Sequence, residues 1–205
     1  MSISLVVFDL GKVLLDFDYT IPARRIAEFS DAPLGAAGFL AANAPLLVRY
    51  ETGLINTAQF CDEMRRAIRF TGNAETFSEI FADIFSPIEP MLQLHSALRA
   101  QGVRTFIFSN TNDLHISHIR KRYPFFASFD GYILSYEHGA MKPDAKLYEV
   151  VERETGCSGG EIIYFDDRAE NVAAGTARGW NAILHETPEK SRAALERFGF
   201  AIGEV

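Results

Sequence analysis

The sequence of 205 residues contains little cysteine and no long apolar run. Cys61 and Cys157 lie far apart and lack the spacing of a metal site, so we expect reduced thiols. No apolar segment approaches the length that spans a bilayer, and the N-terminus lacks the basic region and apolar stretch of a signal peptide. These absences predict a cytoplasmic protein without a membrane partner.

An excess of basic residues is also absent. The chain has 27 acidic and 20 basic side chains and a formal net charge of -7. Binding to nucleic acid or to an anionic membrane requires a basic face, so we expect neither as a partner. A small-molecule ligand is the remaining expectation, and the composition leaves the oligomeric state open.

Three short apolar segments each end in polar residues. Residues 4–8, 105–108 and 162–165 are rich in β-branched and aromatic side chains, as strands buried on both faces are. Open α/β sheets bind their ligands at the carboxyl ends of the strands, so the residues that follow are candidates for a site. The alternative is that such carboxylates only cap the next turn. The residues concerned are Asp9, Ser109 with Asn110, and Asp166 with Asp167.

Strands and helices alternate after Gly102, which predicts an α/β fold with a doubly wound, Rossmann-like parallel sheet. The span from Asp9 to Thr105 is much longer than one crossover helix, so it contains an insertion. We expect a core of residues 1–18 and 91–205, with a small cap, helical throughout, at residues 19–90.

One cap helix has a distinct start signal. Asn56 is followed three residues later by Gln59, as in a variant capping box. Phe60, Met64 and Ile68 then recur every fourth residue, the spacing of one helix face. We expect these side chains to pack inside the cap rather than to bind a ligand.

Four motifs in chain order carry a family resemblance. They are Asp9-Leu10-Gly11, Ser109-Asn110, Lys142-Pro143 at the predicted start of a helix, and Asp166-Asp167 followed by Asn171. Together they resemble the signature motifs of the haloacid dehalogenase-like hydrolases over essentially the whole chain. Residues 8–11, 109–115, 164–167 and 50–53 are similar to a bacterial branch of this family that includes an α-glucose-1-phosphate phosphatase.

This resemblance implies a Mg²⁺-dependent phosphatase for small phosphorylated metabolites, such as the sugar phosphate glucose 1-phosphate. Asp9 would be the nucleophile and would form an aspartyl-phosphate, which splits one hard displacement into two easier ones. A hard cation would separate this carboxylate from the phosphate. The metal ligands implied are Asp9, the backbone carbonyl of Gly11 and Asp167, with Asp166 binding directly or through water.

The resemblance also implies groups that hold the substrate. Ser109 would donate its hydroxyl to the phosphate, and Asn110 would donate from its backbone or side chain. Lys142 would neutralise charge on the transferring oxygens. In the cap, residues 50–53 form a polar turn between apolar helices, so we expect Glu51 to contact the substrate. His115 and His118 lack a third metal ligand nearby, and we expect an exposed helix face there.

Gly11 departs from the pattern of most phosphatases of this family, which have an acid–base Asp at this place. The haloacid dehalogenases lack it too, so one alternative is a metal-independent dehalogenase in which Asp9 attacks carbon. Another is a non-catalytic regulator that binds sugar phosphates. In a phosphatase, the lack of an acid predicts a steep dependence on leaving-group acidity. Residues that could replace it are Asp16, Asp18, Glu51, Asp113 and His115.

Overall fold

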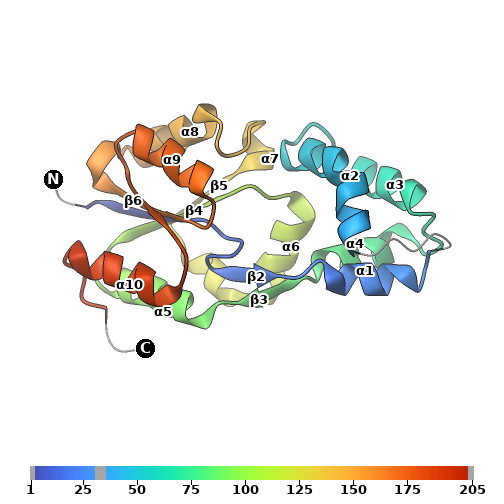
Figure 1. Ribbon diagram of the computed structural model, residues 1–205, viewed down its shortest axis with the longest axis horizontal. Helices are drawn as coiled ribbons and strands as arrows, with labels where there is room; N and C mark the ends of the chain where they lie inside the picture. Colours follow the sequence, from blue (N-terminus) through green and yellow to red (C-terminus); the bar gives the residue numbers. More distant parts are fainter. Residues whose placement is uncertain (1–2, 31–35, 203–205) are drawn as a thin grey trace.

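The computed structural model describes residues 3–30 and 36–202. Its main sheet has five parallel strands in the order β5-β4-β1-β6-β7, so the predicted fold class is confirmed (Figure 1). The order reverses direction around β1, which places β1 in the middle of the sheet, and all four of its residues are buried. The strands are β1 (Leu5–Phe8), β4 (Arg104–Ser109), β5 (Gly131–Leu134), β6 (Ile162–Asp166) and β7 (Asn181–Leu184).

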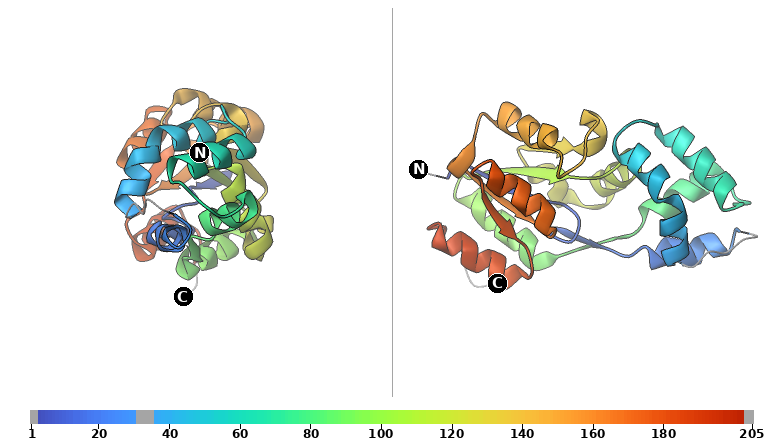
Figure 2. Two further views of the ribbon diagram at one scale, coloured as in Figure 1. Left: turned by 90° about the vertical axis from the view of Figure 1, so that its right-hand side faces the viewer. Right: turned by 45° about the horizontal axis from the view of Figure 1, so that its top comes forward.

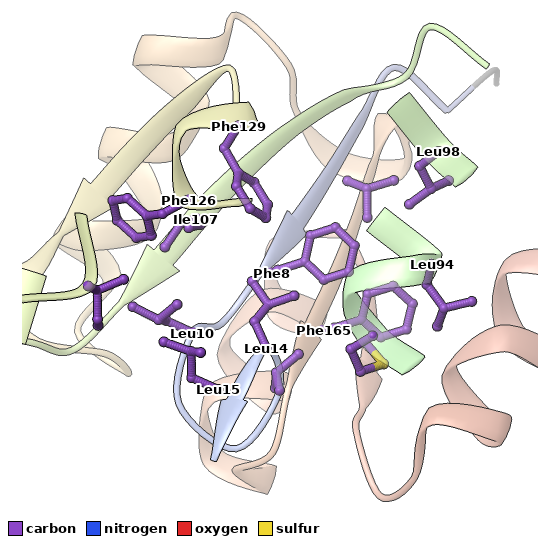
Figure 3. Packing of buried hydrophobic residues seen from close by; sticks show 14 of the residues in the cluster. Phe8, Leu10, Leu14, Leu15, Leu94, Leu98, Ile107, Phe126, Phe129 and Phe165 are labelled. Carbon is purple, nitrogen blue, oxygen red and sulfur yellow. The ribbon is translucent and has the colours of Figure 1, made fainter. Parts of the chain in front are cut away.

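Helices cover both faces of this sheet. Alternate residues of β1 point to opposite faces, so Val6 and Phe8 pack with α5 (Glu89–Ala100), α6 (Asp113–Arg122) and α10 (Pro188–Arg197). Figure 3 shows Phe8 and Phe165 packed near Leu94 and Leu98 on this side. The other face packs against α8 (Ala145–Thr155) and α9 (Ala169–Ala177). Because β1 is enclosed on both sides, the residue that follows it has a rigid support.

The inserted segment forms a second helical body at the end of the molecule away from both termini (Figures 1 and 2). Its helices share a separate buried cluster that includes Phe60, Phe77 and Phe81. The predicted capping box is confirmed, since the Asn56 side chain accepts from the Gln59 backbone and the Gln59 side chain accepts from the Asn56 backbone. The helices are α1 (Thr20–Ala27), α2 (Ala36–Glu51), α3 (Thr57–Ala67) and α4 (Ala74–Ala82). None of the described helices is long and apolar enough to cross a membrane.

The cap is not helical throughout, and that expectation was wrong near its C-terminal end. β2 (Leu15–Phe17) and β3 (Phe85–Pro87) pair antiparallel and form a ribbon between the two bodies. Each strand has three residues, too few to show a period of two in the sequence. We propose that this ribbon divides a cap, residues 19–90, from a core of residues 1–18 and 91–205.

The helix expected to open at Pro143 begins two residues later. Asp144 is its N-cap, and the Asp144 side chain accepts a hydrogen bond of 2.9 Å from the Lys146 backbone. An aspartate that caps a helix satisfies a backbone N–H that would otherwise lack a partner. Lys142 therefore lies in the preceding turn. A short helix that was not predicted, α7 (Ser135–His138), follows β5.

The cap contacts the core through the turn at residues 50–53. The Tyr50 hydroxyl accepts a 3.1 Å hydrogen bond from the Leu114 backbone at the start of α6. Gly53 has a φ of +68°, and a Cβ at this position would lie 2.2 Å from the backbone oxygen of Tyr136. A backbone atom has little room to move away, so only glycine fits at this contact.

We predict that Gly53→Ala destabilises the protein more than Gly102→Ala does. Gly102 has a similar φ of +75°, but no atom lies within 4 Å of the place of its Cβ. Both substitutions cost about 1 kcal/mol for the left-handed backbone, and the clash at Gly53 adds at least about 1 kcal/mol. Urea unfolding measures both free energies. Equal losses would contradict a tight contact between the turn and Tyr136.

Candidate active site

The loops after β1, β4 and β6 converge with the turn before α8 and the C-terminal end of α2 around one cavity of about 220 Å³. The cavity brings together every residue proposed for the site except Asp166, which lies buried directly beneath it. The parallel strands explain this meeting, because their carboxyl ends share one edge of the sheet. The predicted residues that line the cavity are Asp9, Gly11, Glu51, Ser109, Asn110, Lys142 and Asp167.

Lys142 lies at the centre of the cluster and its side chain is only 1% exposed. Its ammonium is 3.0 Å from Asp9 Oδ1 and 2.7 Å from Asp166 Oδ2, and it donates a 2.8 Å hydrogen bond to the carbonyl of Phe108. Asn110 holds the backbone of this lysine: its side chain accepts from Lys142 N at 2.7 Å and donates to Lys142 O at 3.0 Å. Both ends of that amide are therefore oriented by the Lys142 backbone.

Asp166 is fully buried, and both of its oxygens have partners. Oδ2 accepts from Lys142 and from the Tyr164 hydroxyl. Oδ1 accepts from the Asn171 side chain and the Arg168 backbone, each at 2.9 Å. Burial raises the pKa of Asp166, but Lys142 and these donors outweigh it and the net shift is downward. Asp166 is thus an ionised anchor for Lys142 without a free oxygen for direct metal binding.

The negative charges of Asp9 and Asp167 have fewer hydrogen-bond donors and cations around them than that of Asp166. Asp9 Oδ1 accepts from the Leu10 backbone at 2.6 Å, whereas Oδ2 has no hydrogen-bond partner among the described residues. Burial raises the pKa of Asp9 to about 7, although Lys142 opposes the shift. Burial and the adjacent Asp166 raise the pKa of Asp167. Burial is the main cause of both pKa shifts, and a cation bound nearby would favour the ionised form of both acids.

These three acids form a group that suits a hard cation. Asp9, Asp166 and Asp167 each offer a carboxylate oxygen within 4.8 Å of the others, and a single ammonium lies between them. Like charges at this separation repel strongly in a partly buried site. Mg²⁺ prefers one or two carboxylates together with carbonyl and phosphate oxygens. The free oxygens of Asp9 and Asp167, with the Gly11 carbonyl beside them, fit that ion.

Ser109 is buried at the end of β4 and lines the cavity, 3.4 Å from the carbonyl of Asn110. The loop behind it is held by Ser135, which accepts from the Thr111 backbone at 2.9 Å and donates to the Thr111 carbonyl at 3.1 Å. The serine hydroxyl is therefore presented from a fixed backbone. Its position is the one expected for a donor to a bound anion.

Glu51 reaches the cavity from the cap. It is the last residue of α2, and none of the ion pairs of the described residues involves it. Burial raises the pKa of Glu51 to about 7, and the Asn112 side chain opposes this shift. Tyr19, another cavity residue, also faces Glu51. The sequence placed Glu51 near the site through its polar turn, but it carried no signal for the raised pKa.

His115 is buried, so the expected exposed helix face was wrong for this residue. Its ring stacks on Phe81 with centroids 4.9 Å apart and meets Phe85 edge-on at 5.1 Å. Asn112 caps α6 and also lies 3.0 Å from His115 Nδ1. Burial lowers the pKa of His115 to about 3. The docking of α4 on this face of α6 buries the histidine, and that contact is not visible in the sequence.

Gly11 is enclosed by an aromatic side chain that the sequence analysis did not identify. A Cβ at Gly11 would lie 2.9 Å from Cε1 of Phe17. Phe17 is on β2, and the Lys12 ammonium lies 4.5 Å from the centre of its ring. The space next to Gly11, where an aspartate side chain would begin, is therefore filled by Phe17. The place of Phe17 beside Gly11 follows from the pairing of β2 with β3, which the sequence did not predict.

The fold and the site define a hydrolase of the haloacid dehalogenase-like type. The chain belongs to this family: the family model described as "haloacid dehalogenase-like hydrolase" matches residues 3–179. The prediction of a haloacid dehalogenase-like phosphatase is thereby supported at the level of the family, and two relatives are named as a phosphatase and as a 5'-nucleotidase.

The first of these relatives is the sesquiterpene phosphatase astK of Aspergillus oryzae, 27% identical over 84% of this chain and 85% of its own length. The second is the pyrimidine 5'-nucleotidase YjjG of Escherichia coli, 27% identical over 88% of this chain and 81% of its own length. Among solved structures, the HAD family enzyme bt-2542 of Bacteroides thetaiotaomicron, in complex with magnesium and inorganic phosphate, superposes with a TM-score of 0.76. It is 22% identical and covers 89% of this chain and 94% of that one, which shows a shared fold.

We predict that Glu51→Gln raises the free energy of unfolding, relative to that of the wild type, by more at pH 8 than at pH 5. The unfolded carboxyl titrates near 4.5 and the folded one near 7, so the folded state binds more protons and wild-type stability falls as pH rises through this window. The amide cannot ionise and avoids this loss, which is up to about 2 kcal/mol. Urea unfolding of both proteins at the two pH values measures it. A stability difference that is the same at both pH values would show that Glu51 titrates normally.

Proposed function

We propose that this protein is a Mg²⁺-dependent phosphomonoester hydrolase that forms an aspartyl-phosphate on Asp9. The observation that carries the proposal is the excess of negative charge around Asp9. Three carboxylates lie close together, but the one ammonium among them pairs only with Asp9 and Asp166, and the oxygens left free belong to Asp9 and Asp167. A bound Mg²⁺ would supply the positive charge that lets a phosphate approach these acids.

The residues of the chain have separate tasks in this reaction. Asp9 is held through Oδ1 by Leu10 and Lys142, which leaves Oδ2 directed to the phosphorus or the metal. The Ser109 hydroxyl and the Asn110 backbone N–H donate to the phosphate oxygens. Lys142 places its charge beside the carboxylate that attacks, through its contact with Oδ1, where negative charge is redistributed in the transition state. Asp9, Asp167 and the Gly11 carbonyl would hold the metal, and Asp166 orients Lys142.

The residues that line the cavity suit small substrates such as sugar phosphates. Phe17, Tyr19 and Phe85 supply aromatic surface, and Glu51 supplies an oxygen acceptor. Aromatic rings suit the C–H face of a sugar, while a carboxylate or carboxyl accepts from its hydroxyls. We propose glucose 1-phosphate as a representative substrate. The two relatives named above act by name on a sesquiterpene and on a pyrimidine nucleotide, which supports the phosphomonoester class rather than one alcohol.

The charges and contacts of the site argue against two alternative functions. A metal-independent haloacid dehalogenase must bind an anionic substrate without a cation, and the pair Asp166 and Asp167 opposes this. A non-catalytic sugar-phosphate sensor has no need of a nucleophile held by Lys142. The charge excess therefore favours the phosphatase.

We predict that hydrolysis of phosphomonoesters, glucose 1-phosphate among them, requires Mg²⁺. Removal of the metal with a chelator leaves the carboxylates uncompensated, so we expect at least a 100-fold loss of kcat/KM that added Mg²⁺ restores. Phosphate release from a panel of phosphomonoesters measures this. Hydrolysis of 2-chloropropionate in the chelated protein, without phosphatase activity, would support the dehalogenase instead.

We predict that Asp9→Asn reduces kcat by at least about 10³-fold, because an amide cannot form the covalent intermediate. The fold survives, since the substitution removes a negative charge from an acidic cluster. Circular dichroism and phosphate release measure the two effects. Turnover close to that of wild type, with an unchanged spectrum, would exclude Asp9 as the nucleophile.

A further inference from the structure

The cavity lacks the acid that a phosphatase of this family usually presents next to its nucleophile. Departure of an alkoxide is slow unless the leaving oxygen receives a proton, and water attacks slowly unless a base removes one. An acidic side chain at position 11 would have to displace the ring of Phe17, which would lie 2.9 Å from its Cβ. A different residue must supply the proton if poor leaving groups are to react.

Most of the other candidates have no access to the cavity. Asp16, Asp18 and Asp113 are all exposed. Asp16 forms an ion pair with Lys12, Asp18 accepts a hydrogen bond from the Thr20 backbone, and Asp113 accepts one from the Thr57 hydroxyl. None of these three acids lines the cavity. His115 does, but Asn112 occupies its Nδ1, and its ring is stacked on Phe81. Its environment holds it neutral.

Glu51, in contrast, has access to the cavity. Its carboxyl lines the same cavity as Asp9, but from the cap, whereas Asp9 comes from the end of β1. The neighbouring residues fix it: Tyr50 accepts from Leu114, and Gly53 lies against Tyr136. None of the described basic residues forms an ion pair with this acid, so no fixed cation keeps it ionised.

We propose that Glu51 is the general acid and base of the reaction, delivered by the cap in place of an acid at position 11. This inference depends on the proposed phosphatase function. In the first step Asp9 attacks phosphorus, the bond from phosphorus to the ester oxygen breaks, and the Glu51 carboxyl gives that oxygen its proton. In the second step the Glu51 carboxylate takes a proton from water, the water oxygen attacks phosphorus, and the bond to Asp9 breaks. Phosphate leaves, and both side chains return to their starting state.

The surroundings of Glu51 agree with this role. Tyr19, at the start of α1, is the ionisable group that interacts with it, and His115 on α6 lines the same cavity. Burial raises the pKa of Tyr19 and lowers that of His115, so both are neutral near pH 7. A carboxyl with a pKa of about 7 is available in both its protonated and its ionised form at that pH.

The test is a series of substituted phenyl phosphates of similar size whose phenols differ in acidity, measured with Mg²⁺. With Glu51 as acid, kcat/KM of the wild type depends weakly on the acidity of the phenol, the reverse of the expectation from Gly11 alone. In Glu51→Gln the dependence becomes steep: the loss is about 100-fold or more for phenyl phosphate and only a few-fold for 2,4-dinitrophenyl phosphate. Glu79→Gln, on the exposed face of α4 in the same cap, is the matched control and behaves as wild type.

Each outcome decides a different point. If kcat/KM depends on the acidity of the phenol with the same slope in wild type and in Glu51→Gln, Glu51 acts in binding or folding, whatever the size of the loss. That outcome would overturn the acid–base role of Glu51 but not the phosphatase function. Absence of phosphatase activity in the wild type would overturn the proposed function and this inference with it. The unfolding free energy of Glu51→Gln shows whether the variant is folded under the assay conditions.

Discussion

The contact of one buried ammonium with two carboxylates organises the site. Lys142 joins the end of β1 to the end of β6 through Asp9 and Asp166, and it also binds the carbonyl of Phe108 on β4. A buried ion pair that lost one partner would leave an isolated charge at a cost of several kcal/mol. Three adjacent strands are thus tied together at the place where the chemistry occurs, and the Tyr164 and Asn171 side chains complete the partners of Asp166. Asp167 is left outside this network and remains available to a cation.

Much of the core was predictable because its signals are local. Short apolar strands, glycines at helix ends and the cap at Asn56 each depend on a few consecutive residues, and the parallel topology then requires Asp9, Ser109 and Asp166 to meet. The β2–β3 ribbon was not predictable, because its two strands lie far apart in the chain and are very short. The position of Phe17 beside Gly11 and the burial of His115 under α4 were not predictable either, because they too depend on contacts between segments far apart in the chain.

In the proposed reaction the cap contributes chemistry as well as enclosure. Its aromatic cluster gives it a core of its own, and it contacts the catalytic body both through the turn at residues 50–53 and through the packing of α4 on α6. The position of Glu51 in the cavity depends on the contacts of this turn, because its neighbours Tyr50 and Gly53 lie against Leu114 and Tyr136.

The ring of Phe17 beside Gly11 also limits how this site can change over generations. An aspartate introduced at position 11 would meet the ring before it could reach a substrate, and a smaller residue at position 17 alone would only open a gap. An acid at position 11 therefore requires the ring of Phe17 to shift or a smaller residue to replace it, so the residues at positions 11 and 17 are constrained together although they lie on different elements.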